Sequence, residues 1–115
     1  MNYLLLAYDG EKRCDAMSSP AGALFEQACL ANDEALRESG RLLAIERLPR
    51  SATTVQSCEG QVVVNEGPFV ATSAPIVGIF LINARDLNEV IGVAAQMPQL
   101  QSGAIEIRSM ENFAA

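Results

Sequence analysis

Ile76-Val77-Gly78-Ile79-Phe80-Leu81-Ile82 is a run of seven residues without a charged or polar side chain. A second, nearly continuous apolar run lies at residues 2–8. Runs of this kind are typical of β-strands that are covered on both faces, whereas a strand with one solvated face alternates apolar and polar residues. We therefore expect the two runs to form the central strands of one sheet.

Two helical patterns separate the strand patterns. Residues 22–39 repeat apolar or small side chains along one face, and Gly40 stands where a helix stop is expected. The residues of this face are Phe25, Ala28, Cys29, Asn32 and Leu36. In the second pattern Asp86 is a predicted N-cap, Glu89 follows as in a capping box, and Pro98 marks the end. The predicted apolar face of this helix comprises Leu87, Val90, Ile91 and Ala94.

The remaining strand patterns are more polar. Residues 41–48 and 103–110 read as strands that carry charged side chains, which suits positions nearer the edges of a sheet. Residues 53–58 and 61–64 are β-rich and flank Glu59-Gly60, which predicts a hairpin with a two-residue turn. The resulting order of elements is β-α-β, a hairpin, then β-α-β.

This order predicts an α+β fold of the ferredoxin-like βαββαβ type with an inserted β-hairpin, in one domain over residues 1–115. Such a fold places both helices on one face of the sheet, yet the central strands are apolar on both faces. A second copy packed sheet to sheet would cover the other face and form a dimeric α+β barrel. We therefore expect a homodimer with a cavity between or beside the sheets.

Asn65-Glu66-Gly67-Pro68-Phe69 predicts a shaped corner between the hairpin and the third core strand. Gly67 permits a backbone conformation that a Cβ would resist, and Pro68 fixes its own φ angle. A carboxylate, Glu66, and an aromatic ring, Phe69, flank the corner, as the rim of a pocket would require.

Composition excludes several classes of function. The chain has 115 residues and a net charge of −6, and its one lysine and seven arginines form no basic cluster, which argues against nucleic acid as a partner. It has no histidine and its three cysteines are widely spaced, so no zinc or other metal site is predicted. No cofactor fingerprint, signal peptide or membrane-length apolar run is present, and we expect a cytoplasmic protein without a cofactor.

The chain resembles the YCII-related superfamily and, within it, the subfamily named for an Asp-Gly-Pro-Phe motif. The segments that carry the resemblance are Asn65-Glu66-Gly67-Pro68-Phe69, Thr53-Thr54-Val55, Ile79-Phe80-Leu81-Ile82 with Asp86-Leu87, and Gly103-Ala104-Ile105-Glu106-Ile107-Arg108. The resemblance implies a ferredoxin-like subunit that dimerises through its sheet, in a bacterial cytoplasmic family whose biochemical activity is largely undefined. Some relatives are found with, or fused to, extracytoplasmic-function sigma factors.

The chain also departs from the pattern of this subfamily. The aspartate of the motif is Glu66 here, and the usual continuation Ala-Glu-Thr-Lys-Glu is replaced by residues 70–74, which keep only Thr72. Better-known relatives are suspected of using a histidine with an aspartate, and a chain without histidine has no imidazole for acid–base chemistry.

The candidate ligand-binding residues are Tyr8, Glu66, Phe69, Thr72 and Arg108. Glu66 is the one motif-located candidate for acid–base catalysis, and its alternative role is that of a solvated turn residue. Each of the other residues has a functional role and an alternative structural one. Phe69 either stacks on a ligand or packs in the core, and Tyr8 either reaches the cavity rim or packs in the core. Arg108 either contacts an anion or pairs with Glu106.

The leading hypothesis is a homodimeric small-molecule-binding domain with an undefined enzymatic activity. The alternative is a non-catalytic regulatory or protein-interaction module, linked to sigma-factor-associated regulation.

Overall fold

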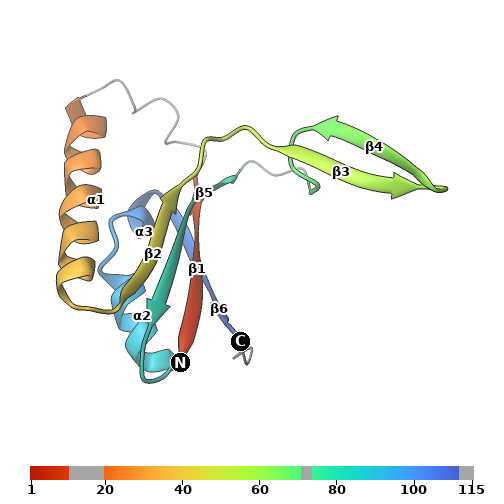
Figure 1. Ribbon diagram of the computed structural model, residues 1–115. Helices are drawn as coiled ribbons and strands as arrows, with labels where there is room; N and C mark the ends of the chain where they lie inside the picture. The colour runs from red at the N-terminus through yellow and green to blue at the C-terminus, as the bar shows by residue number, and fades with distance from the viewer. Residues whose placement is uncertain (11–19, 71–73, 112–115) are drawn as a thin grey trace.

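The computed structural model describes residues 1–10, 20–70 and 74–111 of the chain, and for Pro20 and Ala21 the backbone alone (Figure 1). The strands are β1 (Asn2–Asp9), β2 (Leu42–Arg47), β3 (Thr53–Cys58), β4 (Gln61–Glu66), β5 (Ile76–Asn83) and β6 (Gly103–Ser109). The helices are α1 (Pro20–Glu38), α2 (Leu87–Ala95) and the single turn α3 (Gln99–Ser102). None of the described helices is both long enough and apolar enough to span a lipid bilayer.

Four strands form the main sheet, in the order β2-β5-β1-β6. Every neighbouring pair in this sheet is antiparallel, and the two apolar runs, β1 and β5, lie in the centre as predicted. With one helix after β1 and another after β5, this is the predicted ferredoxin-like arrangement. The strands β3 and β4 pair only with each other and form a separate two-stranded antiparallel sheet.

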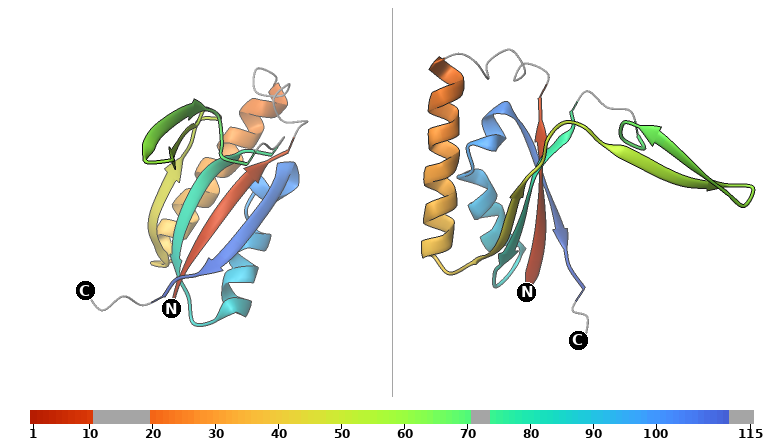
Figure 2. Two further views of the ribbon diagram at one scale, coloured as in Figure 1. Left: turned by 90° about the vertical axis from the view of Figure 1, so that its right-hand side faces the viewer. Right: turned by 45° about the horizontal axis from the view of Figure 1, so that its top comes forward.

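All three helices cover one face of the main sheet, and no described helix lies on the other (Figures 1 and 2). The burial of β1 alternates accordingly: Tyr3, Leu5 and Ala7 are buried on the helix side, whereas Leu4 and Leu6 are only half-buried on the opposite side. We call this second side the open face. The apolar runs thus have one face in the core and one that the described part of the chain leaves uncovered.

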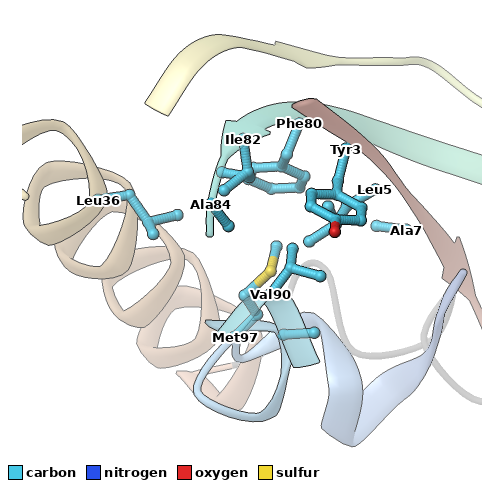
Figure 3. Close-up of a cluster of buried hydrophobic side chains, with 10 residues drawn as sticks. Tyr3, Leu5, Ala7, Leu36, Phe80, Ile82, Ala84, Val90 and Met97 are labelled. Atoms are coloured by element: carbon cyan, nitrogen blue, oxygen red, sulfur yellow. The ribbon is translucent and has the colours of Figure 1, made fainter. Parts of the chain in front are cut away.

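The core lies between the helix side of the sheet and the helices (Figure 3). Phe80 and Ile82 from β5 meet Tyr3 from β1 and Val90 from α2, and all four are almost completely buried. Met97, from the short connection between α2 and α3, also enters this cluster. Burying side chains of this size is the main stabilising contribution to the fold.

The helix ends follow the predictions, but the helix faces follow them only in part. Asp86 caps α2 by accepting a hydrogen bond from the Glu89 amide (2.9 Å), and Gly40 has the positive φ (77°) of a helix-terminating glycine. The residues predicted to be buried but found exposed are Ala28, Leu87 and Ile91. On α1 the buried stripe is rotated toward Gly22 and Asp33, because Asp33 has a cationic partner on β2 that the helical pattern does not reveal.

We call the β3–β4 hairpin, residues 53–66, the arm. Its turn is formed by Glu59 (φ 50°) and Gly60 (φ 81°), and two consecutive positive φ angles are the signature of a type I′ hairpin turn. The arm leaves one end of the main sheet and projects away from it on the side of the open face (Figures 1 and 2). The rest of the described chain, which we call the body, is the helix-covered sheet.

Candidate functional site

Two adjoining cavities lie at the end of the sheet where β1 finishes and β5 begins. The first, which we call the inner cavity, has a volume of about 500 Å³ and is bounded by the sheet, α1, α3 and the segment after β2. The second, the edge cavity, has a volume of about 590 Å³ and lies beside the base of the arm. Both are lined by Tyr8, Leu48, Pro49 and Arg50, which makes this segment the wall that they share. Volumes of this size fall within the range of small-molecule sites.

An ion pair, Asp9 with Arg50, lies in this wall. Asp9 is the last residue of β1 and is buried, and its Oδ2 accepts a hydrogen bond from Nη2 of Arg50. Backbone hydrogen bonds anchor Asp9 and the segment that leads to Arg50: the Asp9 amide donates to the Pro75 carbonyl (2.9 Å), and the Leu48 amide donates to the Val77 carbonyl (2.9 Å). A buried carboxylate needs such a charged partner, because desolvating an unpaired charge is costly. Arg50 is therefore held in place by Asp9 while about two-fifths of its side chain stays exposed.

A second set of charges borders the inner cavity. Arg47 on β2 bonds to the buried Asp33 of α1 (Nη2 to Oδ2, 3.0 Å) and also pairs with Glu26 (Nη1 to Oε1, 3.3 Å). Partial burial works to lower the pKa of Arg47, but the charges of Glu26 and Asp33 outweigh it and raise this pKa above its ordinary value. These pairs tie α1 to β2 and hold the Arg47 guanidinium at the cavity wall, where its charge is balanced by the two carboxylates.

Gln99 supplies an uncharged polar group to the inner cavity. It is only 9% exposed, and its Oε1 has no hydrogen-bond partner among the described residues. Its position depends on a close approach of the chain at Gly103, where an added Cβ would lie 1.8 Å from the Tyr8 carbonyl oxygen. Only glycine fits there, so α3 and its Gln99 can sit directly against the end of β1. The cavity wall thus offers a buried acceptor that a ligand donor can meet.

A third polar cluster begins at the wall shared by the cavities and continues over the open face. The Tyr8 hydroxyl donates to Oε1 of Glu106 (3.3 Å), and Nε of Arg108 donates to Oε2 of the same carboxylate (2.7 Å). Burial, followed by the charge of Glu106 and the hydrogen bond to it, raises the pKa of Tyr8 above its ordinary value. Tyr8 therefore stays a neutral hydrogen-bonding group at physiological pH, and this residue is among those that line both cavities.

Comparison with known proteins decides the family. A family model described as the YCII-related domain matches residues 1–114 of this chain. The chain belongs to the YCII-related family. An uncharacterised protein from Rhizobium meliloti (strain 1021) is 26% identical to it over 114 residues, which cover 96% of this chain and 92% of that protein.

A solved structure supports the fold of this YCII-related chain. It is that of 5-chloro-2-hydroxyhydroquinone dehydrochlorinase from Burkholderia phenoliruptrix AC1100, in complex with 2,5-dihydroxybenzoquinone. The match covers 98% of this chain and 96% of the dehydrochlorinase, with a TM-score of 0.59 and 13% sequence identity. The shared property is the fold.

The structure places the predicted site residues in three different surroundings. Tyr8 lines both cavities, and Glu106 links it to Arg108 on the open face, so these two candidates share one cluster. Glu66 and Phe69 are exposed at the base of the arm, and neither lines the inner or the edge cavity, although Pro68 and Val70 beside them line the edge cavity. Thr72 lies outside the described residues.

The predicted corner has the backbone conformation that was expected to require glycine. Gly67 has a φ of 107°, in the region that favours glycine, and its amide donates to the Ala52 carbonyl (2.7 Å). The Thr54 hydroxyl in turn donates to the Gly67 carbonyl (2.7 Å). Because Ala52 and Pro68 line the edge cavity, the corner shapes one of its walls.

Sequence reasoning missed most of the polar residues around the cavities: Asp9, Asp33, Arg47, Arg50 and Gln99. One signal was present, since Asp9 ends an apolar strand and Arg50 follows the proline that ends another. Of the cysteines, Cys29 is buried and Cys58 is exposed, while Cys14 lies outside the described residues. Over residues 1–10, 20–70 and 74–111, no group of three or more potential metal-ligating side chains has the geometry for a metal ion.

Proposed function

We propose that this YCII-related chain is a homodimeric protein that binds a small molecule in the inner and edge cavities, and that any reaction it catalyses takes place there. The observation that carries this proposal is the ion-paired Arg50 in the wall common to both cavities. A guanidinium that is already oriented by a buried carboxylate can bind an anionic or carbonyl oxygen without first being ordered.

The lining of the cavities defines the class of ligand. Apolar side chains such as Leu48, Pro49 and Ile76 make up much of the edge cavity, where Tyr8 and Arg50 supply polar groups. The inner cavity shares these two residues and is more polar, because it is also lined by Asp9, Glu26, Arg47, Gln99 and Ser102. This combination fits a compact, flat, oxygen-bearing molecule, with acceptor oxygens toward Arg50 and a hydroxyl toward Gln99. The complex of the Burkholderia dehydrochlorinase with 2,5-dihydroxybenzoquinone, a ring with four oxygens, supports this class.

The homodimer is supported by the open face. Leu4 and Leu6 from β1 lie directly opposite Leu81 and Ile79 from β5, and together they form an apolar strip that the described chain leaves half-exposed. Contiguous apolar patches on a sheet commonly mark an interface. A second copy on the open face would also bring its own residues toward Arg108, Glu66 and Phe69, which we retain as candidate ligand contacts together with Tyr8 and Thr72.

A thermal-shift experiment tests the cavity assignment, with 2,5-dihydroxybenzoquinone and a set of small hydroxylated aromatic acids as probes. We expect one probe class to raise the Tm of the wild-type protein, since a ligand at about 100 times its Kd stabilises by about 2.7 kcal/mol. Arg50→Met should abolish the ligand-induced shift, and Arg50→Lys should retain part of it.

Arg85→Met is the matched control, because Arg85 is an exposed arginine that pairs with Glu89, away from both cavities. It should keep the full ligand-induced shift. Since Arg50→Met also removes the ion pair with Asp9, each variant is compared with its own ligand-free Tm. An unchanged shift in Arg50→Met, or no shift in the wild-type protein with any probe, would rule out this site.

A second candidate function is that of a non-catalytic regulatory or protein-interaction module. The exposed valines of the arm favour it, because solvent-exposed apolar side chains on a projecting hairpin are typical of a contact surface. In this case no small-molecule probe should raise the Tm.

A further inference from the structure

The two faces of the arm differ in polarity. In its register Val55 pairs with Val64, and Ser57 pairs with Val62, so these residues share one face of the hairpin. We call it the valine face; it also includes Thr53 and Glu66. The opposite face is mainly polar and contains Thr54, Gln56, Cys58, Gln61, Val63 and Asn65. The arm is thus amphipathic, as a sheet that packs against something on one side should be.

Nothing in the described part of the chain covers the valine face. Val55, Val62 and Val64 are 63%, 72% and 61% exposed, whereas Val63 on the polar face is only 39% exposed. An isolated two-stranded hairpin is marginally stable in water and gains stability by packing an apolar face. The arm therefore has a physical reason to dock, and its apolar side is the one available for docking.

The direction of the arm indicates what it meets. It leaves the end of the main sheet and runs out over the side that carries no helix (Figures 1 and 2). The open face borders the same space with its strip of leucine and isoleucine side chains. A body stacked on the open face would consequently lie beside the arm.

We infer that the valine face of the arm packs against the body of a second copy of this chain, so that each copy in the dimer is held by the arm of the other. This inference rests on the homodimer of the proposed function and adds a second contact surface to it. A contact of this kind is reciprocal in a twofold-symmetric dimer, because both copies present the same surfaces.

The dimensions agree with this arrangement. Two sheets that stack face to face lie about 10 Å apart, and strands of six residues extend for about 20 Å. The arm is consequently long enough to pass the sheet of a stacked partner and reach its helix layer.

The number of contacts also favours docking. Roughly a dozen side chains point out of the open face, fewer than the 20–30 residues that a stable dimer usually contributes from each side. The valine face adds six residues from each copy to the contact.

Sedimentation equilibrium tests the inference with the double variant Val62→Thr/Val64→Thr. Threonine keeps the β-branched shape that suits a strand but replaces a methyl group with a hydroxyl, so the hairpin is retained while the apolar face is lost. We expect the Kd of the dimer to rise about tenfold or more, which corresponds to about 1.4 kcal/mol. The control, Val63→Thr on the polar face of the same strand, should change this Kd by less than about threefold.

A second variant separates this inference from the homodimer itself. Leu81→Glu places a charge in the centre of the open face and should weaken the dimer strongly. If Leu81→Glu weakens the dimer and the valine pair does not, the homodimer stands and arm docking is wrong. A wild-type protein that stays monomeric at high micromolar concentration overturns both.

Hydrogen exchange supplies a direct readout of the arm. When wild-type dimer is diluted below its Kd, the amides of β3 and β4 should lose protection, because each arm loses its cover. Docking would be contradicted if the amides of the arm were equally protected in the monomer and the dimer. It would also be contradicted if the Val62→Thr/Val64→Thr protein lost as much arm protection on dilution as the wild type does.

Discussion

The body and the arm use the same strand-forming residues and end in opposite states of burial. Ile82 in β5 is 0% exposed, because it belongs to the buried cluster between the sheet and the helices, whereas Val62 in β4 is 72% exposed. Both sheets are antiparallel hydrogen-bonded ladders; the ladder of the arm runs without a register shift, and that of the main sheet shifts at Ala7/Tyr8 and at Leu42/Ala44. The two sheets differ in what packs against them. Helices cover one face of the main sheet, whereas no described helix packs against the sheet of the arm.

This difference indicates how stability is distributed. Side chains in the body take part in one buried cluster, so each of them contributes to the cooperative unfolding of the whole unit. In a single copy the arm is stabilised mainly by its turn and its cross-strand pairs, and it can open without disturbing the core. Substitutions in the two regions should therefore affect different measurements.

The largest effect is expected for Phe80→Ala. Phe80 is 2% exposed in the centre of the core, and removing a buried phenyl ring costs about 3–5 kcal/mol in the free energy of unfolding. Urea denaturation followed by circular dichroism measures this change. Phe69→Ala is the control from the base of the arm, where Phe69 is 73% exposed, and it should change the stability of the monomer by less than about 0.5 kcal/mol. Equal effects of the two substitutions would show that the body and the arm are not distinct.

An intermediate effect is expected for Gly67→Ala, at the junction of the arm and the body. A Cβ there would contact no other group, so the cost comes from the positive φ of 107° and should be about 1–2 kcal/mol. Gly92→Ala is the matched control: Gly92 lies in α2, its Cβ would also have open space, and its φ is not in the positive range. That substitution should stabilise the protein by about 0.5–1 kcal/mol. Relative to the wild type, the urea midpoint should fall for Gly67→Ala and rise for Gly92→Ala. A Gly67→Ala protein as stable as the wild type would contradict the argument from the positive φ angle.

The smallest effect is expected for Glu89→Gln, at the start of α2. Burial alone would raise the pKa of Glu89, but hydrogen bonds from Arg85 and the charges of Arg41 and Arg85 lower it below its ordinary value near 4.5. A lowered pKa means that ionised Glu89 stabilises the fold at pH values above 4.5, and that this contribution is lost as the pH falls through the lower, folded-state pKa.

The Tm of Glu89→Gln should consequently lie below that of the wild type at neutral pH, and the two values should converge in acid. Glu34→Gln is the control, because its carboxylate is more exposed and pairs with one arginine at a longer distance, 3.7 Å. A Tm difference for Glu89→Gln that does not depend on pH would contradict the pKa argument.

Much of the fold could be predicted from the sequence because it depends on local patterns. The uninterrupted run at residues 76–82 identified a central strand, the Glu59-Gly60 pair identified the hairpin turn, and Asp86 identified the start of α2. The helix faces were less predictable, as Leu87 and Ile91 show: both fit the apolar spacing, yet only Val90 and Ala94 of the predicted face are buried, and Leu87 and Ile91 remain about half-exposed. Spacing alone does not specify how far a helix is covered.

The polar groups around the cavities could not be predicted because they depend on long-range pairing. Asp9 and Arg50 are 41 residues apart in the chain and meet only when the end of β1 lies beside the segment after β2. The same applies to Arg47 and Asp33, whose contact joins a strand to a helix. By contrast, Tyr8 was identified because it ends an apolar strand, and the pairing of Arg108 with Glu106 followed from their two-residue spacing on one strand.

The corner at Gly67 has a mechanical consequence. The Gly67 amide donates to the Ala52 carbonyl, and the Gly67 carbonyl accepts from the Thr54 hydroxyl. These two hydrogen bonds join the segment that enters the arm to the segment that leaves it. Ala52 and Pro68 on either side of this joint also form part of the edge cavity. The joint that anchors the arm is therefore also part of the cavity wall, and we expect a change in the direction of the arm to alter the space in which a ligand would lie.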